Sequence, residues 1–182
     1  SQRGVTGTDG TATAASNALT ITLDDEDETT IDLAAFTTEN DDDSDKDVAL
    51  ALTISGPRTV TLLNYAQGAL VANNATTVTL PDYEWNAGAS FDEVVTLAVH
   101  KVAADMTLSL ADYPDLEDLD VRNAAYTLKN PTGYDISVSG NTNIETVNIN
   151  GYFSSFDATG ASNLDSITTA GEVGTFVLTA SD

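Results

Sequence analysis

The stretch Ile136-Ser-Val-Ser-Gly-Asn-Thr-Asn-Ile-Glu-Thr-Val-Asn-Ile-Asn-Gly-Tyr-Phe-Ser-Ser155 decides the fold, because residues 156–175 repeat its pattern without a gap. Gly140 falls on Gly160, Val147 falls on Ile167, and a third copy begins at Phe176. A fixed period of this length is typical of a unit that cannot bury its apolar face alone and stacks on its neighbours. The pattern therefore predicts that equivalent side chains 20 residues apart lie one over another.

Pairs of apolar residues two positions apart recur about twice in each period. They include Leu119/Val121, Val147/Ile149 and Ile167/Thr169. Two short strands per period would form two parallel sheets that face each other, so we expect a repeat β-solenoid over residues 102–182. The alternative is a continuous antiparallel sandwich, because strands recur at a similar spacing in that fold as well.

Within these repeats, the segments Ser139-Gly-Asn-Thr-Asn-Ile-Glu-Thr-Val147 and Thr159-Gly-Ala-Ser-Asn-Leu-Asp-Ser-Ile167 resemble the short leucine-rich repeats of bacterial surface proteins. The resemblance covers about residues 116–182, and it implies alternating half-repeats of 10 or 11 residues. The chain departs from that family in two ways. Tyr152 and Glu172 stand where the family has a buried Asn, and many of the leucines are Ile, Val, Phe or Thr. These departures favour a flat, short solenoid over a curved horseshoe.

Upstream of the repeats, the chain divides into two further parts. Residues 1–16 are rich in Gly, Thr and Ala without an apolar period, which predicts a flexible N-terminal arm. Residues 17–101 contain short alternating segments separated by turn residues, as in Ala18-Leu-Thr-Ile-Thr-Leu23. No helical period appears there, so we expect an immunoglobulin-like β-sandwich over 17–101 and an all-β chain as a whole.

The charge of the chain restricts its partners. Twenty-nine acidic residues against six basic ones give a formal net charge of −23, and the sequence contains no cysteine. The six basic residues are scattered singly, so the sequence predicts no binding to nucleic acid or to an anionic membrane surface. Excess Asp with little Lys is also typical of marine or halophilic proteins.

The acidic run at residues 39–47 is the candidate metal site. Asp41, Asp43 and Asp45 have the first spacing of a calcium loop, and calcium is the only cofactor that the sequence suggests. Lys46 stands where that loop needs Gly, and Leu52 stands where it needs an acid, so a helix–loop–helix calcium site is not predicted. A looser site between loops and a solvated loop that repels edge-to-edge pairing are the two remaining interpretations.

No motif for nucleophilic catalysis appears, and we predict no catalytic residue. His100 is the single histidine, and a lone histidine at a strand end favours a structural position. Tyr83 and Trp85 are two large aromatics close together in the sequence, and they either contact a partner or close the end of the sandwich. A carbohydrate-active enzyme with a pair of carboxylates is a third, weaker class.

These features together predict a non-enzymatic structural protein. The whole chain resembles a capsid decoration, turret or fibre-type surface protein of a tailed virus, which implies a location on the virion surface and other virion proteins as partners. The third repeat stops within its turn, so Phe176 and Leu178 are expected to contact another subunit of a homo-oligomer, for which a trimer is one expectation. The alternative is a secreted cell-surface adhesin or surface-layer module that binds glycan or protein.

Overall fold

The computed structural model describes residues 5–6, 10–15, 18–23, 28–33, 51–64, 70–85, 89–91, 93–102, 104–123 and 133–178. Every regular element within these ranges is a β-strand. The strands are β1 (Val5–Thr6), β2 (Gly10–Ala15), β3 (Ala18–Leu23), β4 (Glu28–Asp32), β5 (Ala51–Ser55), β6 (Thr59–Leu63), β7 (Leu70–Asn73), β8 (Thr77–Trp85), β9 (Ala89–Ser90), β10 (Thr96–Val102), β11 (Met106–Thr107), β12 (Asp118–Arg122), β13 (Tyr134–Ser137), β14 (Thr146–Asp157) and β15 (Ser166–Val177). The all-β prediction is therefore confirmed for these residues.

Strict alternation of apolar and polar side chains builds most of these strands. In β5, Leu52 and Ile54 are buried while Thr53 between them is half-buried, and β6 repeats this pattern with Val60 and Leu62. Successive side chains of a strand point to opposite faces, so each strand has one apolar and one polar face. The β-branched and aliphatic residues that dominate the apolar face also suit the pleated backbone.

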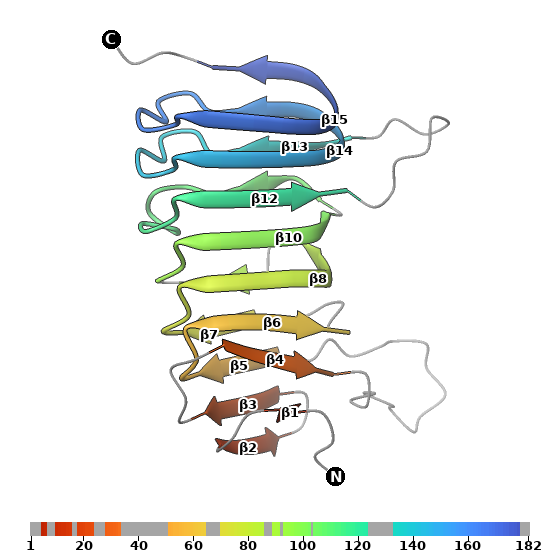
Figure 1. The fold of residues 1–182 in the computed structure, drawn as a ribbon, viewed down its shortest axis with the longest axis vertical. Helices are drawn as coiled ribbons and strands as arrows, with labels where there is room; N and C mark the ends of the chain where they lie inside the picture. Colours follow the sequence, from red (N-terminus) through yellow and green to blue (C-terminus); the bar gives the residue numbers. More distant parts are fainter. Residues whose placement is uncertain are drawn as a thin grey trace.

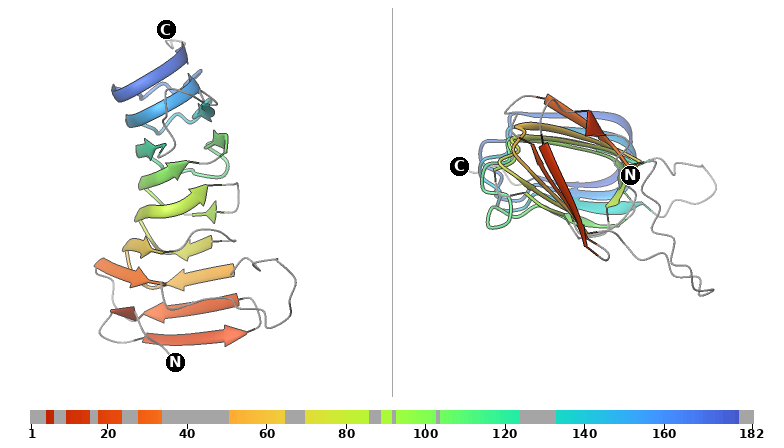
Figure 2. Two further views of the ribbon diagram at one scale, coloured as in Figure 1. Left: turned by 90° about the vertical axis from the view of Figure 1, so that its right-hand side faces the viewer. Right: turned by 90° about the horizontal axis from the view of Figure 1, so that it is seen from below.

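The strands form two open sheets. The first contains β1, β4, β6, β8, β10, β12, β14, β13 and β11 in that order, with β15 beside β14, and the second runs β2, β3, β5, β7, β9. The pairs β1·β4 and β2·β3 are antiparallel, and all other pairs of described strands are parallel. The strands stack along one axis, and the two termini lie at opposite ends of the stack (Figure 1). Seen from its end, the stack has a flattened cross-section (Figure 2).

The core is a set of columns in which one residue of each strand lies beside its counterpart on the next. The longest column crosses seven strands and contains Thr29, Val60, Val78, Leu97, Leu119, Val147 and Ile167. The first six of these side chains are buried, and Ile167 at the end of the column is partly buried. The largest fully buried side chains are Phe91, which follows β9 of the second sheet, and Phe153 and Phe156 of β14. Burial of this apolar surface is the main favourable contribution to the stability of the stack.

The predicted 20-residue offset is confirmed in the pairing of β14 with β15. Every described pair in this ladder joins residues 20 apart, including Val147 with Ile167 and Phe156 with Phe176. Strand β14 pairs with two different strands along its length, since Thr146–Asn150 pairs with β12 while Phe153–Asp157 pairs with β13. Gly151 lies between these two segments with a φ of 113°, a value that side chains other than hydrogen rarely permit.

Two expectations for the first hundred residues differ from the structure. An immunoglobulin-like sandwich over 17–101 requires antiparallel neighbours, whereas β3, β5, β7 and β9 pair in parallel, as do β4, β6, β8 and β10. Alternation is typical of antiparallel sheets with one solvated face, and the parallel strands here alternate as well because one of their faces is only half-buried. Within the predicted flexible arm, β1 and β2 form antiparallel pairs with β4 and β3. The first sheet also runs through the predicted boundary at residue 101, since β10 pairs with both β8 and β12.

Candidate functional site: a polar groove over β12, β14 and β15

A groove of about 220 Å³ lies on the outer face of the C-terminal part of the first sheet. It is lined by Asp120, Arg122, Asn148, Ile149, Asn150, Thr168 and Ala170. The strand register places these residues in two rows, one with Asp120, Asn148 and Thr168 and the other with Arg122, Asn150 and Ala170. The inward-facing neighbours Val121 and Ile149 are buried, so the alternation of the strands turns both rows outward.

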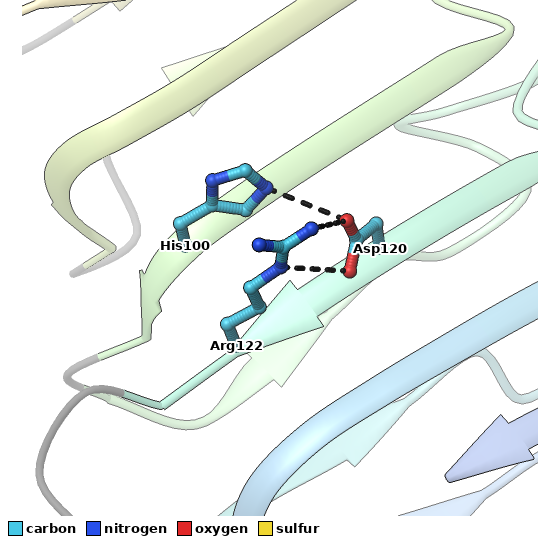
Figure 3. Close-up of polar contacts among 3 residues, drawn as sticks. All are labelled: His100, Asp120 and Arg122. Atoms are coloured by element: carbon cyan, nitrogen blue, oxygen red, sulfur yellow. Dashed lines mark hydrogen bonds and ion pairs between the residues drawn. The ribbon is translucent and has the colours of Figure 1, made fainter. Parts of the chain in front are cut away.

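Asp120 and Arg122 form an ion pair at one end of the groove (Figure 3). Nη2 of Arg122 donates a hydrogen bond of 2.8 Å to Oδ2 of Asp120, and Nε donates a longer one of 3.4 Å to Oδ1. These hydrogen bonds raise the pKa of Arg122 above its ordinary value. The side chains are 47% and 27% exposed, so solvent screens the pair and its contribution to stability is small. Its effect is to fix the direction of both groups at the groove.

His100 approaches the same carboxylate from the neighbouring strand β10. Its Nε2 atom lies 3.4 Å from Oδ2 of Asp120, but this atom makes no hydrogen bond and is buried. The approach of Nε2 to Oδ2 is therefore a polar contact, and the two side chains form an ion pair only when the imidazole is protonated. The register between β8 and β10 shifts between Val99 and Lys101, so His100 lies at an irregularity of the ladder. Such irregularities re-aim a side chain relative to a regular strand.

The groove has three further polar side chains. Within the part of the chain that the structure describes, the side chains of Asn148, Asn150 and Thr168 have no protein hydrogen-bond partner. Ala170 ends the second row with a short side chain and thereby leaves the groove open at that corner. The groove thus combines one paired carboxylate, one guanidinium, two amides and a hydroxyl. This set can exchange hydrogen bonds with a ligand in both directions.

The groove contains one carboxylate, which already accepts from Arg122, whereas glycoside hydrolysis needs two carboxyl groups at a defined separation. Among the described residues, no group of three or more His, Cys, Asp or Glu side chains could hold a metal ion. In the same ranges the chain has no helix that could cross a membrane.

The residues singled out from the sequence lie elsewhere. Asp41, Asp43 and Asp45 are outside the described residues, so calcium binding stays a prediction. Tyr83 and Trp85 belong to β8, but their side chains are outside the described part of the structure. Phe176 and Leu178 lie at the end of the stack with 43% and 55% of their surface exposed. None of these residues lines the groove.

The sequence contained a signal for the groove that residue types alone did not reveal. The apolar pairs Leu119/Val121 and Val147/Ile149 each bracket one outward position, which is Asp120 in the first pair and Asn148 in the second. Their side-by-side placement depends on the register between β12 and β14, where the offset is 28 residues instead of 20. The extra residues between β12 and β14 break the 20-residue spacing, so the sequence repeat does not align Asp120 with Asn148.

No family model, curated protein or solved structure matches this chain. The resemblance to bacterial leucine-rich repeats therefore stays a prediction, and function has to be argued from the geometry.

Proposed function

We propose that this protein is a non-enzymatic structural surface protein, and that its sheets are the two walls of one continuous β-solenoid. The column from Thr29 to Ile167 supports the solenoid, because seven consecutive strands keep one register along the whole stack. In such an arrangement each turn of chain contacts only its neighbours, and the outer faces remain available as long flat surfaces. The leucine-rich-repeat resemblance of residues 116–182 belongs to this proposal.

The observation that carries the proposal is the exposed apolar end of the stack at β15. Among the described strands β15 pairs only with β14, and Phe176, Val177 and Leu178 are exposed. At the other end β1 and β2 are the last strands of the two sheets, and they pair antiparallel with β4 and β3. An edge strand has unpaired backbone groups, and exposed apolar side chains on it favour association with another strand. A stack that associates through an end strand suits a structural subunit of a larger assembly.

We place this subunit on a virion as a capsid decoration, turret or fibre component that contacts other virion proteins and assembles as a homo-oligomer, a trimer being the first form to test. The outer faces of the strands are rich in Thr, Asn and Asp, which suits a surface that must stay solvated. The strong negative charge disfavours the nucleic acid inside a capsid and is compatible with a location outside the shell.

Immunogold labelling of the source culture, with antibodies raised against the purified chain, tests this location. The proposal expects gold on particle shells in electron micrographs, and the protein should co-purify with particles in a density gradient. Gold confined to cell envelopes would overturn the virion assignment and would support the adhesin or surface-layer module. Preimmune serum and antibody pre-absorbed with the pure protein are the controls.

Light scattering coupled to size-exclusion chromatography tests the association. The wild-type chain should form an oligomer at micromolar concentration, and replacing both Phe176 and Leu178 by Ser should shift it toward the monomer. Replacing the exposed Thr168 and Thr175 by Ser is the matched control on the same strand, and this variant should keep the oligomer. A monodisperse wild-type monomer in both low and high salt contradicts the proposed association.

A further inference from the structure

We propose that the groove over β12, β14 and β15 is a binding site for one neutral saccharide unit. This inference goes beyond the structural role and does not depend on it, because a saccharide site would serve a virion protein and a cell-surface protein equally.

The spacing of the groove groups suits a ligand of one sugar ring. Neighbouring strands lie roughly 4.8 Å apart, and outward residues of one strand lie about 6.6 Å apart. Asp120, Asn148 and Arg122 are therefore close enough for one small ligand to reach several of them at once. Because regular strands position all of these side chains, the array is held by the register of the sheet and not by a loop.

The chemistry of the groove selects a neutral ligand that both donates and accepts hydrogen bonds. Asn148, Asn150 and Thr168 each offer a donor and an acceptor, and Arg122 keeps N–H groups beyond those given to Asp120. A hydroxyl group likewise donates and accepts, so a ring with several hydroxyls matches this mixture. The ligand hydroxyls would donate to the carboxylate of Asp120 and accept from Arg122.

Charged ligands fit less well. An anion would approach the Asp120 carboxylate on a chain whose formal charge is −23. A cation would meet the guanidinium of Arg122, which lies 2.8 Å from the only carboxylate in the groove. Each charge is neutralised locally by the other, so a neutral ligand avoids both penalties.

The size of the groove limits the affinity. Its volume of about 220 Å³ is below the range of drug-sized pockets, and no aromatic side chain lines it. Binding would rest on hydrogen bonds that replace hydrogen bonds to water, each of which contributes little net free energy. We therefore expect dissociation constants on the order of millimolar for a single sugar.

Nuclear magnetic resonance titration of the full ¹⁵N-labelled chain tests the site. The probes are the methyl α-glycosides of glucose, galactose and mannose, raised to about 100 mM so that millimolar binding saturates. At least one of them should produce saturable shifts of the Asn148, Asn150 and Arg122 side-chain or amide signals. Methyl glucuronide as the anion and choline as the cation should produce at least tenfold weaker effects.

Two variants on β15 make the test specific. Ala170→Leu fills the open corner of the groove without removing any polar group, and it should weaken binding at least tenfold. Thr175→Leu places the same side chain at an exposed position of the same strand outside the groove, and binding should remain unchanged. The spectra themselves report whether each variant is folded.

Several results would overturn the saccharide site. These are the absence of saturable shifts with all three glycosides, unchanged binding in A170L, and equal binding of the glucuronide or choline. The last outcome would show that the groove does not select neutral ligands.

Discussion

Asn141 is a fully buried polar residue at the turn that precedes β14. Its amide Nδ2 donates to the backbone carbonyls of Leu108 and Tyr113 at 3.4 and 3.3 Å, and its Oδ1 accepts from the backbone N–H of Asn143 at 3.2 Å. The side chain thus replaces hydrogen bonds that these backbone groups could not obtain from water. It ties the turn to the preceding segment, 28 to 33 residues earlier in the chain.

Replacing Asn141 by Leu should therefore destabilise the protein by about 2 to 4 kcal/mol, because buried backbone groups lose their partners. The measurement is equilibrium unfolding in urea. Asn148→Leu is the matched control, since Asn148 is exposed, and its effect should stay within about 0.5 kcal/mol. Equal losses in both variants would show that the Asn141 hydrogen bonds do not contribute.

Asp157 and Thr159 form a second local contact, on the next equivalent turn. Hydrogen bonds from the side chain and the backbone N–H of Thr159 stabilise the ionised carboxylate and lower the pKa of Asp157 below its ordinary value. A lowered folded-state pKa means that Asp157 stabilises the fold above its unfolded pKa of about 3.9. That contribution is lost as the pH falls through the lower, folded-state pKa.

Thr159→Ala should raise the pKa of Asp157 part of the way toward its ordinary value, since the backbone hydrogen bond remains. Carboxyl ¹³C resonances recorded against pH measure the change directly. Thr169→Ala, at an exposed position away from Asp157, should leave this titration unaltered. An unchanged Asp157 titration in T159A would contradict the assignment of the side-chain hydrogen bond.

At the scale of the elements, the backbones of β14 and β15 approach closely at a pair of glycines. Gly151 and Gly171 face each other across this ladder, and a Cβ on Gly171 would meet the backbone N and O of Gly151. A backbone clash cannot be relieved by moving a flexible side chain. The 20-residue repeat of glycine at these positions thus has a steric reason.

Gly171→Ala should consequently destabilise the protein by about 1 to 3 kcal/mol, the usual cost of overpacking. Hydrogen exchange should be faster for the β15 amides in particular, because the clash pushes β15 away from β14. Ala170→Ser, at the neighbouring exposed position, is the control and should leave both unfolding and exchange near wild type. Wild-type exchange of β15 in G171A would contradict the close approach.

A second feature of the same pair is the contact between Phe156 and Phe176. Their rings pack edge to face with centroids 6.1 Å apart, and Phe176 leaves 43% of its surface exposed while Phe156 is fully buried. The final strand therefore covers the aromatic core of the preceding one but has no equivalent cover among the described residues. This difference within a single column is the element-level basis of the proposed association.

At the scale of the whole molecule, charge repulsion opposes the stack. A formal charge of −23 on 182 residues weakens a compact structure at low ionic strength, where the screening length is about 30 Å at 0.01 M salt. The six basic residues can neutralise only a small part of this charge. The described Arg122 already uses its guanidinium on Asp120.

The melting temperature should rise when NaCl increases from about 0.01 to 0.5 M, because added salt shortens the screening length severalfold. Circular dichroism melts at several NaCl concentrations measure this. Melts in CaCl₂ at matched ionic strength separate screening from binding, and extra stabilisation there would support a calcium site at Asp41, Asp43 and Asp45. A melting temperature that is flat or falls with NaCl would contradict the repulsion.

The sequence by itself determined many of the strands and which of their faces is apolar, but it did not reveal β1 and β2 within the predicted flexible arm. Alternation as in Ala18–Leu23 reflects the two-residue period of the backbone, which every strand obeys regardless of its partner. The 20-residue repeat also determined that Val147 would lie beside Ile167, because equivalent residues of stacked turns share one register.

The tertiary structure alone decided the direction of pairing and the composition of the groove. Alternation is more typical of antiparallel sheets, so the parallel pairing of β3 with β5 and of β4 with β6 was not readable from residues 17–101. The groove joins Asp120 to Asn148 and Thr168 across offsets of 28 and 20 residues. Only the completed register brings these side chains together, because the contacts between strands depend on the length of chain that separates them and not on the local pattern.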